Sequence, residues 1–285
     1  MIPISLIKCP VCGADFRLTE NRRSLDCLGA VRHHCFDVSH AGYLNLVVGH
    51  ASGGDGKEAF RARSSFLEKG YYAPVSDEIN ALLREIGNVG EKSVLVDAGC
   101  GEGYYMNRAV ERLGCTALGF DLSKFAVEHG ARAAGRLNLS DKVFYGVSSV
   151  FEMPLPDACA DAITNIFAPC APTEYARVLK PGGILLVAGA GAEHLFGLKR
   201  AVYDEPYRNE MRADLPKNLP LVAHKKVGYS MHVSDNADIA HLFSMTPYYY
   251  RTNEMGFARL AALCELDTEV DVDIFVYRKP GAKNA

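Results

Sequence analysis

The hydrophobic positions in the middle of the chain form short apolar runs separated by amphipathic stretches. Each short run is typical of a parallel strand buried on both faces, and each amphipathic stretch is typical of a helix packed on a sheet. Strands are predicted at 94–96, 117–121, 143–147, 160–166 and 184–188. Helices are predicted at 57–69, 75–86, 106–113, 122–137, 174–179 and 235–245, and from 194 onward. Extended segments are also predicted at 42–48, 219–233 and 271–278. This alternation predicts an α/β fold with a parallel central sheet.

Turn-forming residues divide the chain. The glycine-rich stretch 49–56 predicts a flexible linker, and Lys180-Pro181-Gly182-Gly183 predicts a turn before the last parallel strand. We therefore expect a small N-terminal module, a linker with a helix, and a large domain, at residues 1–48, 49–74 and 75–285.

Composition narrows the class of protein. A chain of 285 residues can bury a full core. No run of about 18 apolar residues occurs, and the N-terminus lacks the pattern of a signal peptide, so we expect no membrane span. Nine cysteines, an odd number, favour a reducing cytoplasm. The net charge of −3 argues against a uniformly basic nucleic-acid binder, although the first 72 residues carry a formal +2.

A glycine-rich turn follows the first predicted parallel strand. It reads Gly99-Cys100-Gly101-Glu102-Gly103 and comes directly after Asp97 and Ala98. The glycines permit positive φ and close approach of a ligand to the backbone. Glu102 would repel a phosphate, whereas a cation such as the sulfonium and ammonium of S-adenosylmethionine would be attracted. Asp121, 18 residues after Gly103, ends the next strand, where an acid binds ribose hydroxyls. The pattern favours a class I methyltransferase over a nicotinamide or flavin site or a purely structural turn.

A second group of residues suggests a metal. Cys9 and Cys12 form a Cys-x-x-Cys pair, Cys27 follows, and a fourth ligand lies among His33, His34 and Cys35. Tetrahedral zinc uses such a set, and a module this small needs a metal to fold. The alternative, a thioredoxin-like redox pair, lacks the βαβ pattern that it requires.

The sequence leaves the roles of three further segments open. The fourth strand ends at Phe167-Ala168-Pro169-Cys170, where a methyl acceptor would lie, and Asn165 lies near the end of that strand. Tyr248-Tyr249-Tyr250 either stacks on an extruded base or packs in the core. Tyr71 and Tyr72 either pack a helix junction or cover the cofactor.

Together these motifs resemble the 23S ribosomal RNA guanine-N1 methyltransferases over nearly the whole chain. The residues that carry the resemblance are Cys9, Cys12, Cys27, His34-x-Phe36-Asp37, Gly42-Tyr43-x-Asn45-Leu46, Ala62-Arg63, Phe66-Leu67, Asp97-x-Gly99-Cys100-Gly101-Glu102-Gly103-Tyr104-Tyr105, Ala168-Pro169-Cys170, His194-Leu195 and Met245-Thr246-Pro247.

The resemblance implies a class I (Rossmann-like) fold with a zinc module and methylation of N1 in a domain II hairpin, at a guanine numbered about 745 or 748. The latter group is linked to resistance to macrolides such as tylosin. It implies His34 as the fourth zinc ligand, because His34 matches the position before x-Phe-Asp. It implies that Tyr72, the Gly101-Glu102 pair and His194 contact S-adenosylmethionine, and that the protein is a homodimer.

Two other functions remain open from the sequence. One is a small-molecule methyltransferase in which the zinc knuckle is only a structural cap. The other is a non-catalytic RNA-binding or resistance factor. The arginines beside the knuckle favour the RNA enzyme over the first, and the intact glycine turn favours it over the second. His194 and Asn165 are the two side chains expected near the transferred methyl group, and no general base is assigned.

Overall fold

The computed structural model describes residues 3–49 and 56–281. Its centre is an eight-stranded sheet in the order β10-β11-β9-β8-β5-β6-β7-β4. The strands from β9 to β4 in that order run parallel, whereas β11 pairs antiparallel with β9 and with β10. The predicted α/β architecture is therefore confirmed, and the sheet reverses its strand order at β5 and β8. Ligands of such sheets bind at the carboxyl ends of the strands beside the reversal.

The strands of this sheet are β4 (Leu44–Asn45), β5 (Val94–Ala98), β6 (Thr116–Asp121), β7 (Val143–Val147), β8 (Ala160–Ile166), β9 (Leu179–Ala190), β10 (Leu221–Val233) and β11 (Leu266–Arg278). The helices are α1 (Lys57–Glu68), α2 (Ala73–Glu85), α3 (Tyr104–Leu113), α4 (Lys124–Arg136), α5 (Pro172–Val178), α6 (Phe196–Val202), α7 (Asn236–Ser244) and α8 (Glu254–Ala261), with short 3-10 turns η1 (Ile4–Leu6) and η2 (Tyr249–Arg251). Within the described ranges no helix has the length and apolarity needed to cross a membrane.

The two faces of the sheet have different covers. On one face, strand residues such as Leu95 and Tyr145 share a core with apolar residues of α1 to α4, α6 and α7. On the other face, Leu118 and Phe144 pack with α5 and with Phe16 of the N-terminal segment. The central strands are buried on both sides, which is why their sequences are continuous apolar runs.

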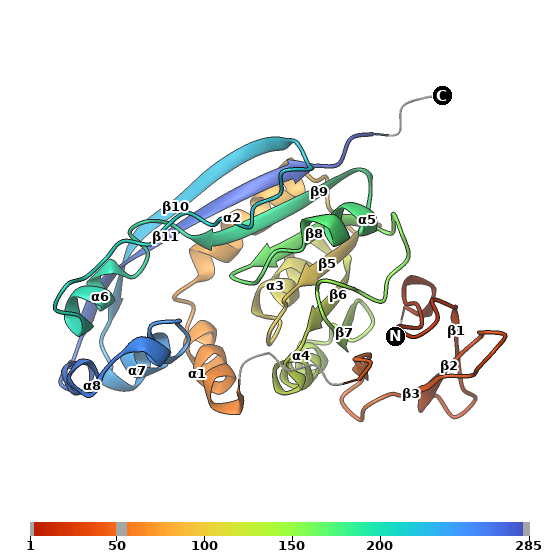
Figure 1. The fold of residues 1–285 in the computed structure, drawn as a ribbon, viewed down its shortest axis with the longest axis horizontal. Helices are drawn as coiled ribbons and strands as arrows, with labels where there is room; N and C mark the ends of the chain where they lie inside the picture. Colours follow the sequence, from red (N-terminus) through yellow and green to blue (C-terminus); the bar gives the residue numbers. More distant parts are fainter. Residues whose placement is uncertain (1–2, 50–55, 282–285) are drawn as a thin grey trace.

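The N-terminal module is a small antiparallel sheet of β1 (Phe16–Leu18), β2 (Ser24–Cys27) and β3 (Cys35–Asp37). It lies beside β7 at the opposite end of the molecule from α6, α7 and α8 (Figure 1). Two backbone connections fix it there: β4 adds a parallel strand to the β7 edge, and the Lys8 amide donates to the Pro154 carbonyl at 2.8 Å. The module thus covers part of a sheet face.

Several sequence predictions need correction. The predicted turn at 180–183 lies within β9, because Gly182 donates to the Lys279 carbonyl and Lys279 donates to Gly183. The strand predicted at 42–48 shrinks to Leu44–Asn45, and β1 to β3 and α8 were not predicted. Residues 50–55 of the predicted linker lie outside the described residues. The other predicted strands and helices are confirmed, with shifted ends.

Candidate active site and metal centre

The glycine turn joins β5 to α3 at the carboxyl edge of the sheet. Gly99, Gly101 and Gly103 all have positive φ, at 84°, 53° and 78°. A Cβ on Gly103 would lie 1.8 Å from the Tyr145 hydroxyl oxygen, and a Cβ on Gly99 would lie 2.4 Å from the Ala168 Cβ. Both the backbone conformation and the packing therefore require glycine at these positions.

The two predicted acids at the strand ends lie near this turn. Asp97 is buried and accepts a hydrogen bond from Thr164 Oγ1 at 2.8 Å. Burial, followed by the charges of Asp121 and Glu102, raises the pKa of Asp97 to about 7, although the hydrogen bond from Thr164 opposes the shift. Asp121 accepts from the backbone N–H of Gly101 at 3.0 Å. Three acids this close together on one turn give it a negative potential that favours a cation.

Glu102 forms an ion pair that the sequence did not predict. Its carboxylate is buried, and Nε of Arg63 donates to its two oxygens at 2.9 and 3.2 Å. Arg63 comes from α1, and its guanidinium also lies over Gly101, where a Cβ would be 3.1 Å from Nη2. Helix α1 is thereby held across the glycine turn. No local sequence signal pairs two residues that are 39 positions apart.

Tyr72 and His194 meet at the same edge of the sheet. Both are buried, and the His194 Nε2 lies 3.2 Å from the Tyr72 hydroxyl oxygen. The Nδ1 atom accepts from the Asp271 backbone N–H at 3.2 Å, so the neutral ring carries its proton on Nε2 and donates it to Tyr72. Burial lowers the pKa of His194 to about 4. His194 is therefore neutral at pH 7, with both ring nitrogens hydrogen-bonded.

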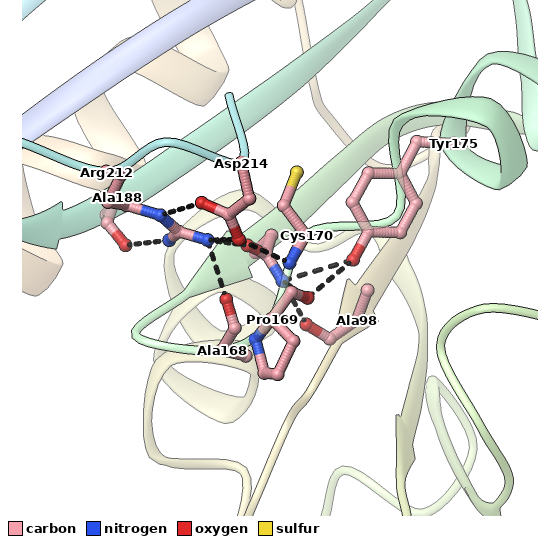
Figure 2. A network of polar contacts seen from close by, with 9 residues as sticks. Ala98, Ala168, Pro169, Cys170, Tyr175, Ala188, Arg212 and Asp214 are labelled. Atoms are coloured by element: carbon pink, nitrogen blue, oxygen red, sulfur yellow. Dashed lines mark hydrogen bonds and ion pairs between the residues drawn. The ribbon is translucent and has the colours of Figure 1, made fainter. Parts of the chain in front are cut away.

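Arg212 and Asp214 hold the loop that follows β8 in place. Figure 2 shows Arg212 between Ala188 and Ala168, with its Nη2 donating to the Ala168 carbonyl at 2.8 Å. Arg212 also pairs with Asp214, which accepts from the Cys170 N–H at 3.0 Å. This clamp was not predicted, because it comes from the irregular segment between α6 and β10.

Asn165 has a structural role. Its side-chain amide donates to the carbonyls of Ala98 and Pro169, both at 3.0 Å, and to the Tyr175 hydroxyl at 3.1 Å. The side chain thus ties β8 to the end of β5 and holds the following loop. With these contacts it orients the loop that follows β8, and a side-chain amide is not a proton acceptor.

The structure brings the four predicted metal ligands together. The Sγ atoms of Cys9, Cys12 and Cys27 and a ring nitrogen of His34 all lie within 4.8 Å of one another. Cys12 and Cys27 are 3.9 Å apart, and His34 Nδ1 lies 3.6 Å from Cys9 and 3.3 Å from Cys27. Tetrahedral zinc with bonds of about 2.3 Å to sulfur and about 2.0 Å to nitrogen needs edges of about 3.5–3.8 Å. The cluster fits that ion.

The two alternative fourth ligands, His33 and Cys35, do not lie in the cluster. The His33 Nδ1 lies 3.3 Å from the Cys27 carbonyl oxygen, and Cys35 is exposed on β3. The His34 backbone N–H donates to Cys27 Sγ at 3.1 Å, which supports thiolate character at that sulfur. Among the described residues, the group close enough to share one ion contains His34 and neither neighbour.

The glycine turn and its acids match what S-adenosylmethionine requires. The glycines leave the backbone of the turn without side chains, and the carboxyl groups of Asp97 and Asp121 lie beside it, where an ammonium or a sulfonium would be attracted. Such a ligand would supply an activated methyl group. The sequence of residues 95–183 matches the family model "Methyltransferase domain". The sheet, the turn and this match define a class I, S-adenosylmethionine-dependent methyltransferase.

Three relatives narrow the class. A 23S rRNA (guanine(748)-N(1))-methyltransferase of Streptomyces fradiae is 33% identical over 70% of this chain and 68% of its own. A provisionally named 23S rRNA (guanine-N(1)-)-methyltransferase of Micromonospora griseorubida is 32% identical over 91% and 92%. A provisionally named counterpart in Bacillus subtilis is 29% identical over 98% and 99%. The chain belongs to the 23S rRNA (guanine-N1)-methyltransferase family.

Proposed function

We propose that this enzyme methylates N1 of one guanine in 23S rRNA, in the domain II hairpin at position about 745 or 748. The observation that carries the proposal is the joining of the metal cluster to the cofactor sheet through β4. Because β4 runs parallel to β7, it ends at the same edge as the glycine turn. If the methylated guanine is the one at 748, the enzyme would affect susceptibility to macrolides such as tylosin.

The surface of the module supports an RNA partner. Arg22, Arg23 and Arg32 are exposed on the N-terminal module. Arginines on a small rigid module neutralise phosphates and fix the orientation of an RNA hairpin. We therefore propose residues 1–48 as the zinc-binding RNA-recognition module and residues 75–285 as the methyltransferase domain, linked by residues 49–74. We further propose that the enzyme is a homodimer and acts in the cytoplasm.

The proposed site residues have distinct roles. The cofactor is assigned to Tyr72, Asp97, Gly99, Gly101, Glu102, Asp121 and His194, and zinc to Cys9, Cys12, Cys27 and His34. The acids balance the positive charges of the cofactor, while the glycine backbone lets it lie close. Tyr72 and His194, which bond to each other, form the wall next to the β8 loop.

The reaction needs orientation more than acid–base chemistry. The N1 proton of guanine would be lost to water before or during the attack, the N1 lone pair would form the bond to the methyl carbon, and the carbon–sulfur bond would break with its electrons remaining on sulfur. Because the methylsulfonium is already activated, in-line placement supplies much of the rate. His194 and Asn165 are occupied by internal hydrogen bonds, so they position groups and do not take the proton.

The test is methyl transfer from labelled S-adenosylmethionine to unmodified 23S rRNA, followed by primer extension. Methylation at N1 blocks the Watson–Crick edge, so reverse transcriptase stops one nucleotide before the site. We expect label and a stop in the domain II hairpin, with affinity for RNA that falls steeply as salt increases. Label without a stop would place the methyl on another atom. No label, with cofactor bound, would favour a small-molecule acceptor.

A further inference from the structure

Phe167 holds an unusual backbone conformation directly after β8. Its φ is 51°, in the left-handed region that a non-glycine aromatic residue rarely occupies. Its N–H donates to the Ala188 carbonyl at 3.0 Å, which fixes that conformation. The residue is nevertheless 44% exposed. Backbone strain that leaves a large apolar ring in solvent is a reason to look for function.

The rings of His194 and Tyr72 pack against the Phe167 ring. It stacks on His194 with ring centroids 5.6 Å apart and an interplanar angle of 28°. The Tyr72 ring meets it nearly at right angles, with centroids 6.2 Å apart. Both supporting rings are buried, and the Asp271 backbone holds His194 in place. Phe167 is therefore a rigid aromatic surface with part of its ring in solvent.

This surface adjoins the cofactor turn. Ala168, the next residue, packs so closely on Gly99 that a Cβ there would lie 2.4 Å from its own. Arg212 donates to the Ala168 carbonyl and pairs with Asp214, which accepts from the Cys170 N–H (Figure 2). The loop is thus fixed from both sides, and the Phe167 ring is preorganised.

We propose that Phe167 is the stacking residue for the target purine after that base leaves the RNA stack. The inference rests on the proposed function and adds the residue that holds the acceptor. Attack by a ring nitrogen takes place in the plane of the base, so the base must lie flat in a fixed plane. An aromatic face supplies that plane, and enzymes that act on bases use it.

The competing surface lies at η2. Tyr249 and Tyr250 are 40% and 74% exposed, whereas Tyr248 is buried and donates to Asn209. Tyr249 packs on Phe243 and Phe257, so this patch is part of the α7–α8 unit. No contact joins it to the glycine turn among the interactions of the described residues. Phe167 is the better-placed ring for the acceptor.

The experiment compares Phe167→Leu, Phe167→Tyr, Phe167→Gly and Tyr250→Leu. Methyl transfer to 23S rRNA is measured at varied RNA and cofactor concentrations, together with the Kd for S-adenosylmethionine and the Tm. We expect Phe167→Leu to lower kcat/KM for RNA by about 10- to 100-fold, which is about 1.4–2.8 kcal/mol. Cofactor affinity should stay within about twofold. Phe167→Tyr should retain activity.

The glycine variant separates the ring from the strained backbone. Phe167→Gly removes the left-handed strain and should lose RNA activity as Phe167→Leu does, without loss of Tm. Equal losses of cofactor affinity and RNA activity would show a packing role and overturn the inference. So would wild-type activity in Phe167→Leu, or a loss confined to Tyr250→Leu. If the wild-type enzyme labels no RNA, the proposed function fails and this inference fails with it.

Discussion

Nε of Arg63 on α1 donates to both oxygens of the buried Glu102 carboxylate in the glycine turn. This pair joins the helix before the sheet to the cofactor turn. Removing one partner of a largely buried pair leaves the other charge unpaired, which costs more than the pair contributes.

Arg63→Gln should therefore lower the free energy of unfolding by about 2–3 kcal/mol and weaken S-adenosylmethionine binding. Urea unfolding and calorimetric titration measure the two effects. Arg61→Gln, on an exposed position of the same helix, is the matched control and should change neither. The double variant with Glu102→Gln should recover part of the stability. Equal stabilities of the two single arginine variants would contradict the role of the pair.

Asp97 predicts a pH dependence with a defined sign. Its pKa is raised from 3.8 to about 7 in the folded protein. The folded state therefore keeps a proton that the unfolded state has lost, and stability falls as pH rises from about 4 to about 7. The loss is up to about 4 kcal/mol at about 1.4 kcal/mol per pH unit. Asp97→Asn should remove this slope, as seen in unfolding curves across that range.

The same ionisation predicts tighter cofactor binding at higher pH. A cation binds the carboxylate and not the neutral acid, so the Kd for S-adenosylmethionine should fall between pH 6 and pH 8. Thr164→Val should move the midpoint upward, because the Thr164 hydroxyl stabilises the charged form. Superimposable pH profiles for wild type and Asp97→Asn would show that Asp97 ionises normally.

Metal removal should unfold the N-terminal module. Cys12→Ser should release zinc and expose residues 16–37 to hydrogen exchange, because a module this small relies on its metal. Cys35→Ser is the matched control, since Cys35 lies outside the cluster. Zinc content and exchange rates measure the result. A Cys12→Ser protein that stays folded and retains its metal would contradict the assignment.

Asp121 should affect both cofactor affinity and the turn. Asp121→Ala removes the acceptor for the Gly101 and Ser123 amides, so we expect weaker cofactor binding and about 1–2 kcal/mol of lost stability. Asp121→Asn keeps an acceptor and should recover most of the stability while still binding the cofactor weakly. Equal cofactor affinity in all three proteins would remove Asp121 from the site.

The sequence predicted the parts of the fold that depend on local pattern. The apolar runs at β5 to β8 have few alternatives to a buried strand, and the glycine spacing specified the turn. The strands β1 to β3 went unpredicted because each is three or four residues long, with too little periodicity to detect. The pairing of β4 with β7 joins residues about 100 positions apart, which no local rule gives.

The site shows the same division. The four metal ligands follow from a short motif and lie together as predicted. The glycine turn also follows from a short motif, and it joins a strand to a helix as predicted. Arg212 was not identified, and the particular roles of Arg63 and Phe167 were not predicted although both lie in motifs that the sequence analysis singled out, because these roles come from contacts across the fold. Periodicity can place Arg63 on a helix, but not over Glu102. Positive φ at Phe167 has no signal in the residue type, since an aromatic side chain normally avoids it.

The position of the N-terminal module has one more consequence. Phe16 and Leu25 share a core with Leu118 and Phe144, so the module shields an apolar face of the catalytic sheet. A chain deprived of its metal would lose that shield and the added β4 edge together. Such a chain would expose an apolar face of the sheet to aggregation and proteolysis.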